Sequence, residues 1–416
     1  MPTDREILHA LFAAALQAAL PDDKFEGRLP ERPTGRTIVL GAGKASARMA
    51  AAFEEAWERT GGTCEGLVVT RYGHAVPTRF VEVVEAAHPV PDPAGRDAAR
   101  RILALAQGAG PDDLVVCLVS GGASALLSLP AEGLSLEDKQ DLNRALLRSG
   151  APIGEMNLVR KSLSAIKGGR LAAAAGPARL VTYLISDVPG DDPGSIGSGP
   201  TIPERVDPET ALAILRRYAI GVPPHVAEAI RANAVEASVS RGAVHMLATP
   251  KMALDAAAAK ARSFGLAPHV LGDALEGEAR EVGRVMAGIA RSVVQHGEPV
   301  AAPCVLLSGG ETTVTVRGHG RGGRNAEFLL ALALSLKGEE SVSAIACDTD
   351  GIDGSEDNAG AWFDGAFLED ARAAGIDLVS HLADNDAYAA FARMDRLVVT
   401  GPTFTNVNDF RCILVR

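Results

Sequence analysis

Short apolar runs alternate with longer stretches of helical periodicity along most of this chain. Strands buried in a parallel sheet read as near-continuous apolar runs, whereas covering helices repeat their apolar positions every three to four residues. The alternation therefore predicts an α/β fold with a parallel, Rossmann-like sheet that carries helices on both faces. In the first part of the chain, the expected strands are 37–40, 66–70, 113–119 and 180–185, and the expected helices are 44–59, 93–107, 136–149 and 157–175.

A second α/β block is expected from about residue 242, after a proline-rich segment at 189–224. With 416 residues, the chain is long enough for two domains that each have a core. We therefore predict domains at 1–240 and 241–416, and leave open whether the last strand, 411–415, returns to the first sheet. The other expected strands here are 244–248, 268–271, 312–316 and 342–347, with helices at 251–263 and 275–295.

Composition excludes some broad classes of function. The chain has 41 Lys and Arg against 52 Asp and Glu, a formal charge of −11. This balance argues against nucleic-acid binding and anionic membranes as partners, although it permits a local basic pocket for an anionic metabolite. The five cysteines form no CxxC pair, and no apolar run is long enough to span a bilayer. Together these features predict a cytoplasmic protein with reduced thiols.

The most informative segment is 306–334. An apolar run leads into Ser308-Gly309-Gly310-Glu311, and a glycine- and arginine-rich loop then opens into the helix that begins near Arg324. Glycines let a backbone approach a ligand, a helix N-terminus offers N–H donors to an anion, and arginine binds anions bidentately. The segment therefore predicts an anion-binding site.

An earlier glycine turn, Gly41-Ala42-Gly43-Lys44, also follows an expected strand and opens a helix. A dinucleotide-binding turn would need an acidic residue after the second strand, where this chain has Arg71. Because an arginine there suits a 2′-phosphate, an NADP-dependent enzyme stays possible. The other reading is a lysine that projects from a glycine turn toward a ligand.

The run Ser120-Gly121-Gly122 echoes Ser308-Gly309-Gly310 after a similar apolar strand. We expect each domain to present a glycine loop at the carboxyl end of a strand, where open α/β sheets bind ligands, with both loops lining one cleft. The expected substrate- and nucleotide-binding residues are Gly41, Gly43, Ser120, Gly121, Gly122, Ser308, Gly309, Gly310, Glu311, Gly323 and Asn325.

Two acidic loops follow expected strands. Asp187 opens the loop 186–200, and Asp350 lies in the loop 346–360. The second loop lacks the spacing of an EF-hand, but carboxylates among glycines at strand ends suit Mg²⁺, which takes one or two carboxylates and substrate phosphates. Lysine, arginine, backbone amides and carboxylates together favour phosphoryl transfer, which needs mainly positioning and charge neutralisation.

A set of ordered motifs, which spans nearly the whole chain, resembles the class II glycerate kinases. These are glycerate 2-kinases whose C-terminal part carries the MOFRL domain. The motifs are VLGAGKAS, CLVSGGASALL, NLVRKSLSAIKGGRLA, SDVPGDDPGSIGSGPT, LLSGGETTVTVRGHGRGGRNAEF, DTDGIDG and GPTFTNVNDF. The resemblance implies that D-glycerate is phosphorylated to 2-phosphoglycerate by ATP with Mg²⁺, in a cleft between two α/β domains.

The resemblance also implies catalytic roles for Lys44, Asp187, Arg324 and Asp350, with Asp350 and Asp187 as candidate metal ligands. The chain departs from the family pattern at Ser162, Ala326 and Phe404, where we expect His, Gln and Gly. The alternatives are an NADP-dependent hydroxypyruvate reductase, a label that family members often carry, and a metabolite-binding sensor without catalysis. The sequence gives neither the oligomeric state nor the nucleotide preference.

Overall fold

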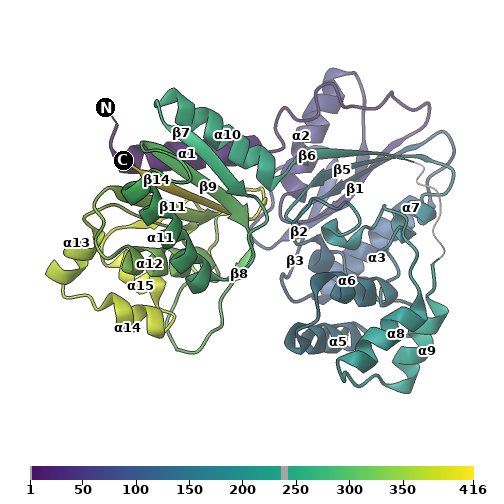
Figure 1. Ribbon diagram of the computed structural model, residues 1–416. Coiled ribbons are helices and arrows are strands. Elements are labelled where there is room, and N and C mark those ends of the chain that lie inside the picture. Colours follow the sequence, from purple (N-terminus) through teal and green to yellow (C-terminus); the bar gives the residue numbers. More distant parts are fainter. Residues whose placement is uncertain (1, 236–241) are drawn as a thin grey trace. The chain divides into compact units, whose positions relative to one another are not determined.

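The computed structural model describes residues 2–235 and 242–416, and its chain forms two compact units (Figure 1). The first unit comprises Pro21–Asp187 and Asp191–Leu247; the second comprises Met1–Leu20, Val188–Gly190 and Ala248–Arg416. Helix α1, Asp4–Ala19, thus groups with the C-terminal part of the chain rather than with residues of the predicted first domain. Its buried face includes Phe12, whose ring lies 5.7 Å from that of Phe410.

The first unit contains a six-stranded sheet in the order β3-β2-β1-β4-β5-β6. Strands β1 to β5 pair in parallel, and this order is that of doubly wound dinucleotide-binding folds. The sixth strand was expected in the second block, but it completes the first sheet. The strands are β1 Thr37–Ala42, β2 Glu65–Arg71, β3 Val81–Ala86, β4 Leu114–Val119, β5 Arg179–Ile185 and β6 Gly242–Ala248.

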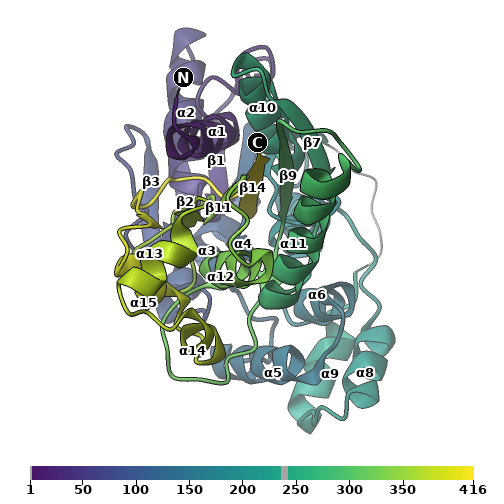
Figure 2. The ribbon, with the colours of Figure 1, turned by 60° about the vertical axis from the view of Figure 1, so that its left-hand side comes forward.

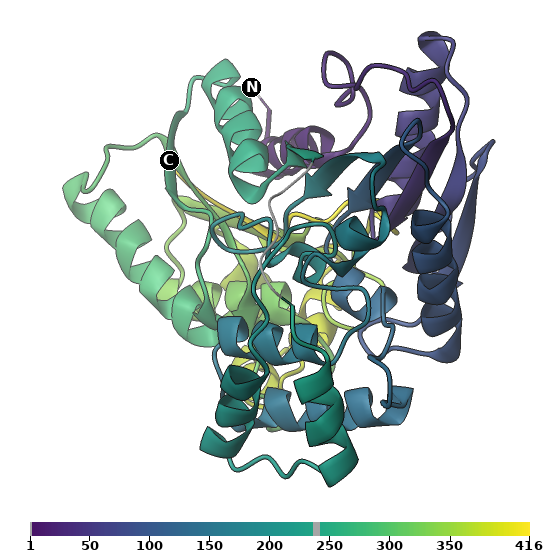
Figure 3. The ribbon, with the colours of Figure 1, turned by 90° about the vertical axis from the view of Figure 1, so that its right-hand side faces the viewer.

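Helices α2, Ser46–Arg59, and α3, Pro93–Gln107, pack on the first sheet. A separate helical group carries its own apolar core, which includes Leu146, Val159 and Leu215, and is seen in blue and teal in the lower part of Figure 3. This helical group consists of α5 Leu136–Ser149, α6 Ile153–Ser162, α8 Pro208–Arg217 and α9 Pro224–Ala232.

The helix expected at 157–175 is wrong as a single element. Helix α6 ends at Ser162, and α7, Arg170–Ala174, begins only after Gly168 and Gly169. Both glycines have positive φ, 61° and 81°, a conformation that glycine adopts without the strain of a Cβ. Two short helices complete this unit: α4 Ala123–Leu126 and the 3₁₀ turn η1 Ile196–Ser198.

The second unit contains a mixed six-stranded sheet in the order β13-β12-β11-β14-β9-β7. The C-terminal strand β14 lies between β11 and β9, so it does not return to the first sheet. Helices α1 and α10 cover one face of this sheet, and α11 and α12 cover the other (Figure 2). The strands are β7 Ala267–Gly272, β9 Cys304–Gly310, β11 Val342–Asp348, β12 Gly360–Phe363, β13 Leu397–Val398 and β14 Asp409–Val415.

The remaining elements of the second unit lie around this sheet. Strands β8 and β10 form a short parallel pair, so the strand expected at 312–316 is reduced to two residues. No helix among the described residues combines the length and apolar character needed to cross a membrane. The remaining elements are β8 Gly277–Glu278, β10 Thr312–Thr313, α10 Pro250–Ser263, α11 Ala279–His296, α12 Arg324–Leu336, α13 Phe367–Ala373, α14 Leu378–Ala383 and α15 Ala387–Ala392.

Candidate active site

Strand register gathers acidic residues at one edge of the second sheet. Asp348 ends β11 and pairs with Asp409, the first residue of β14. Asp409 also pairs with Gly310, the last residue of β9. Because β14 runs antiparallel to both neighbours, two strand ends and one strand start meet at this point. Helix α12 begins beside them with Arg324.

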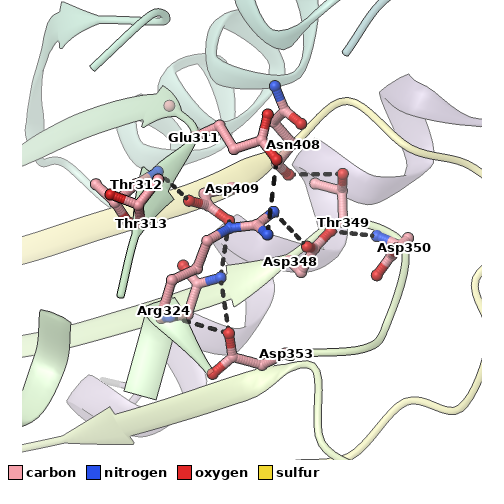
Figure 4. Close-up of polar contacts among 12 residues, drawn as sticks. Glu311, Thr312, Thr313, Arg324, Asp348, Thr349, Asp350, Asp353, Asn408 and Asp409 are labelled. Atoms are coloured by element: carbon pink, nitrogen blue, oxygen red, sulfur yellow. Dashed lines mark hydrogen bonds and ion pairs between the residues drawn. The ribbon is translucent and has the colours of Figure 1, made fainter. Parts of the chain in front are cut away.

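Arg324 binds the two acids of this edge directly (Figure 4). Its Nε donates to Asp409 Oδ1 at 2.8 Å, and its Nη2 donates to Asp348 Oδ2 at 2.6 Å. Glu311 lies 3.8 Å from the third nitrogen. Burial disfavours the charged guanidinium, but Asp409, Asp348 and Glu311 outweigh burial and hold the pKa of Arg324 well above its ordinary value. The side chain is therefore a fixed cation that is already engaged by carboxylates.

Asp353 occupies the N-terminus of α12, where an anionic ligand was expected. Its two carboxylate oxygens accept hydrogen bonds from the amides of Asn325 and Ala326, both at 2.9 Å. A Cβ on Gly323 would lie 2.3 Å from Asp353 Oδ1, so only glycine lets the carboxylate approach this closely. The chain thus fills this helix end with its own carboxyl group, and the predicted binding of a ligand anion there stays a prediction.

The buried Asp353 carboxyl should make the stability of the protein depend on pH. Burial raises the pKa of Asp353 to about 6, although the amides of Asn325 and Ala326 and the charge of Arg324 oppose the rise. In the unfolded chain the group titrates near its ordinary value of 3.8. Between these values the folded protein binds more protons than the unfolded chain, so the free energy of unfolding decreases as pH rises, by about 3 kcal/mol in total.

Replacement of this carboxyl by Asp353→Asn should abolish that contribution. Urea unfolding of wild type and variant across about pH 4 to pH 7 checks it, because the difference between their unfolding free energies isolates one group. The unfolding free energy of the variant should rise relative to that of wild type as pH increases, and the difference should become constant above about pH 6. A difference that stays flat across this range would contradict a raised pKa at Asp353.

The glycine- and arginine-rich loop is also engaged within the chain. The amides of Arg317 and Gly318 donate to Asn385 Oδ1, at 2.8 and 3.1 Å. The next amides, at 319–321, bind acceptors on Asp384 and Asp386. The backbone amides of residues 317–321 therefore all bond within the chain. Its exposed Arg321 pairs with Glu356 and lies 4.7 Å from the centre of the Tyr388 ring.

Asp350 is held in a tight turn after β11. Its amide donates to Asp348 Oδ1 at 3.0 Å, and its own Oδ1 accepts the amide of Ile352 at 2.9 Å. The residue is 2% exposed. Among the described residues, no group of three or more His, Cys, Asp or Glu side chains is arranged to hold a metal ion.

In the first unit, the Lys44 turn is closed by the chain itself. The amides of Gly43 and Lys44 donate to Val69 O at 3.0 Å and Gly121 O at 2.8 Å. Those of Ala45 and Ser46 donate to Ser120 Oγ at 3.0 Å and Gly43 O at 3.1 Å. A Cβ on Gly43, whose φ is 136°, would lie 2.1 Å from Ser120 Oγ. The two glycine turns, after β1 and after β4, thus form one locked structure from which the Lys44 side chain projects.

The predicted site residues fall into two sets. Lys44, Asp187 and the turn 120–122 belong to the first unit, at the carboxyl ends of β1, β5 and β4. Arg324, Asp350 and the residues Ser308 to Glu311 belong to the second. The expectation of a second glycine loop is wrong, because Ser308, Gly309 and Gly310 are buried residues of β9 itself. The roles of Ser308, Gly309 and Gly310 as ligand contacts stay predictions. The catalytic roles of Lys44, Asp187, Arg324 and Asp350 also stay predictions.

Sequence reasoning missed Asp409, which accepts hydrogen bonds from both Arg324 and Asn325 and pairs with the fully buried Arg411. Arg411 Nη1 also donates to Gly309 O at 3.2 Å, which joins the glycine pair to the acidic edge. An available signal was the pair Asp409 and Arg411, an acid and a base two residues apart in a terminal strand whose other residues are apolar. A buried acid at a strand start needs a cation, and Arg324 and Arg411 supply one on each side.

Comparison with known proteins gives two family matches. Residues 7–231 match a family described as a domain of unknown function, DUF4147, and residues 304–409 match the MOFRL family. A protein of Agrobacterium vitis with the provisional name hydroxypyruvate reductase is 55% identical, over 99% of this chain and 94% of its own length. The D-glycerate 2-kinase of Thermotoga maritima is 41% identical, over 95% of this chain and 94% of its own.

The fold is shared with a solved structure. The crystal structure of a glycerate kinase from Thermotoga maritima superposes with a TM-score of 0.90 at 38% identity, over 99% of each chain. Both compact units are therefore present in that enzyme. The names of these relatives divide between a kinase and a reductase, and the glycine turn after β1 bears directly on that division.

Proposed function

Because the chain belongs to the glycerate kinase family with a C-terminal MOFRL region, we propose that it transfers the γ-phosphoryl group of ATP to the 2-hydroxyl of D-glycerate. The chain is a kinase by family. The single observation that carries the choice against a reductase is the closed glycine turn at 43–46, whose amides all bond within the chain.

A nicotinamide dinucleotide needs that turn to be open. In dinucleotide-binding folds the pyrophosphate sits on the amides at the N-terminus of the helix after β1. Here Ser120 Oγ and Gly121 O occupy the amides of Ala45 and Lys44. The last residue of β2 is Arg71 rather than the acid that binds the ribose of NAD, so it is the bonded amides that disfavour NADP. The Rossmann-like strand order therefore does not bring a dinucleotide site with it, and the reductase name of some relatives finds no support here.

The proposed chemistry uses charged groups at strand ends. The bond between the γ-phosphorus and its bridging oxygen breaks while the glycerate 2-hydroxyl oxygen bonds to that phosphorus. The Lys44 ammonium neutralises negative charge on the transferring oxygens. Asp187 accepts the proton of the attacking hydroxyl. Arg324 holds Asp348 and Asp409 in place, and Asp348 in turn accepts the amide of Asp350.

The acidic edge of the second unit suits a magnesium nucleotide. Asp350 would bind Mg²⁺ with its carboxylate, with Asp348 as a neighbouring oxygen donor. When bound, Mg²⁺ would neutralise charge on the β- and γ-phosphates. The fit rests on the donor set: the carboxylates of Asp350 and Asp348 offer oxygen ligands, which are those that Mg²⁺ prefers.

Two substitutions should separate the roles of the acids. Asp350→Asn should raise the Mg²⁺ concentration needed for half-maximal rate, because it removes a charged ligand from the metal. Asp187→Asn should instead lower turnover, by roughly a hundredfold or more, with little change in that concentration. Initial rates measured across a Mg²⁺ titration check both. The assignment of roles would be reversed if Asp187→Asn alone changed the Mg²⁺ requirement.

Product identification tests the proposed reaction itself. Purified enzyme is incubated with ATP, Mg²⁺ and D-glycerate, and the product is identified by phosphorus NMR against authentic 2-phosphoglycerate and 3-phosphoglycerate. We expect only the 2-phosphate. Formation of 3-phosphoglycerate would show that the wrong hydroxyl has been assigned.

A further inference from the structure

One cavity of the first unit is lined by three cationic side chains. Its volume is about 230 Å³, and its cations are Lys139 of α5, Arg160 of α6 and Lys167 of the turn after α6. None of the described residues that line it is an Asp or Glu. The rest of the wall comes from other residues of α5, from Leu163 and from the segments that follow β3 and β4, at the carboxyl ends of parallel strands, where α/β sheets bind ligands.

Two of these cations donate hydrogen bonds only to neutral acceptors, and the third has no acceptor in the part of the chain that the structure describes. Lys167 Nζ donates to the backbone oxygen and hydroxyl of Ser124, at 2.5 and 2.8 Å. Arg160 donates to Asn143 Oδ1 at 2.9 Å and to Asn157. The buried Lys139 Nζ has no hydrogen-bond partner among the described residues. A buried ammonium normally has a partner, so this nitrogen points to a missing acceptor.

The arrangement is costly unless an anion neutralises it. Burial, followed by the nearby charge of Arg160, lowers the pKa of Lys139 to about 7. Burial also lowers the pKa of Lys167 well below its ordinary value, and the charges of Lys139 and Arg160 add to this effect. By contrast, Lys161 on the same helix as Arg160 pairs with Glu204. The cavity therefore lacks the carboxylate that the chain supplies to a neighbouring lysine.

We infer that this cavity binds the carboxylate of the hydroxy-acid substrate, with Lys139 as its principal cationic contact. The inference rests on the proposed kinase function and adds the place of the acceptor to it. Arg324, which the sequence analysis placed in an anion-binding segment, is already bound by Asp409 and Asp348. Lys139, Arg160 and Lys167 are cations without such acids.

The position of Lys44 supports this place for the acceptor. Gly122 lines the cavity, and a Cβ there would lie 3.2 Å from Lys44 Cγ and 3.2 Å from the His88 ring. Lys44 therefore borders the cavity across a glycine. In D-glycerate the carboxylate and the 2-hydroxyl are on adjacent carbons, so an acceptor anchored by its carboxylate has its reacting hydroxyl in or beside the cavity that Lys44 borders. The small volume suits a three-carbon acid, since pockets for larger ligands typically measure ~300–1,000 Å³.

Lys139→Met tests the inference in the intact enzyme. We expect the KM for D-glycerate to rise roughly tenfold to a hundredfold, because a charge-assisted hydrogen bond is lost, while the KM for ATP stays unchanged. Arg144→Met is the matched control, since Arg144 lies on the same helix with its side chain 56% exposed. A rise in the KM for ATP instead would assign the cavity to the nucleotide and overturn the inference, as would unchanged values for both substrates.

A second pair of variants leaves the buried cations intact. Leu147 lines the cavity and is 60% exposed, so substitution there should not disturb folding. Leu147→Glu places an acid at the opening and should raise the KM for D-glycerate several-fold, whereas Leu147→Gln, of the same shape, should not. Equal KM values for this pair would contradict a carboxylate in the cavity.

Calorimetric titration with D-glycerate alone separates this inference from the proposed function. Heat of binding that is present in wild type and Arg144→Met but lost in Lys139→Met supports the cavity whether or not phosphorylation is observed. If wild type phosphorylates D-glycerate but Lys139→Met binds it as tightly as wild type, the inference fails and the kinase function stands.

Discussion

Lys44→Ala is expected to lower the turnover number by roughly a hundredfold or more, because an ammonium that neutralises transferring phosphoryl oxygens contributes most in the transition state. The turn that carries Lys44 is fixed by hydrogen bonds from four successive amides, which hold the backbone of this residue in place. Steady-state rates at saturating ATP and D-glycerate measure the change.

The folded state should not change with this substitution. The turn is held by backbone amides and by Ser120 Oγ, which Lys44→Ala leaves in place. The thermal midpoint should therefore match that of wild type. Lys251→Ala, which removes an exposed lysine paired with Asp255 on α10, serves as the control and should keep normal rates. Near-normal turnover in Lys44→Ala would remove this lysine from the mechanism.

Arg324→Lys is expected to lower turnover by roughly tenfold to a hundredfold, although the charge is conserved. The guanidinium binds Asp409 through Nε and Asp348 through Nη2 at the same time. A lysine ammonium is a single point and cannot bridge two carboxylates in this geometry. Asp348 would then lose the contact that fixes it beside Asp350, and the Mg²⁺ requirement should rise together with the loss of turnover.

Arg321→Lys provides the matched control from the same loop. Its guanidinium pairs with Glu356 at the surface and is 62% exposed, so the substitution should change kinetics little. Initial rates across a Mg²⁺ titration, measured for both variants, decide the matter. A silent Arg324→Lys together with a damaging Arg321→Lys would show that the wrong arginine had been chosen.

Much of the fold was predictable because its strands are apolar on both faces. All six residues of β1 and of β4 are buried, and such strands read directly from the sequence. Strand β3 was missed because its residues Glu82 and Glu85 interrupt the apolar run at the sheet edge. Helix α1 shows another limit: its amphipathic pattern predicts a buried face but does not say which part of the chain covers it.

The sequence predicted which types of residue form the candidate site better than it predicted which residues they bind. The sequence marks the α12 N-terminus as a site for a ligand anion, whereas in the structure its amides bind the chain's own Asp353, 29 residues along the chain from Arg324. Sequence spacing cannot show which acidic residue lies against the N-terminus of a helix in the folded chain. The same holds for Asp409, whose approach to Arg324 depends on the register of β14 with β11 and β9.

The family resemblance, the α/β class and the kinase activity are confirmed by the comparisons, whereas the individual site residues stay predictions. The cationic cavity was not foreseen, because Lys139, Arg160 and Lys167 lie on separate elements. On the sequence alone, lysines and arginines of amphipathic helices read as solvated side chains. Only the packing of α5 against α6 and the β4 loop turns them inward.

Two assays on one preparation test the central claim most directly. The purified protein is given ATP, Mg²⁺ and D-glycerate in one, with ADP release followed, and NADPH with hydroxypyruvate in the other, with NADPH oxidation followed. The proposed kinase function predicts rapid ADP release that depends on D-glycerate, and the closed turn at 43–46 predicts no enzyme-dependent NADPH oxidation. NADPH oxidation by hydroxypyruvate without glycerate-dependent ADP release would contradict the assignment of this chain as a glycerate kinase.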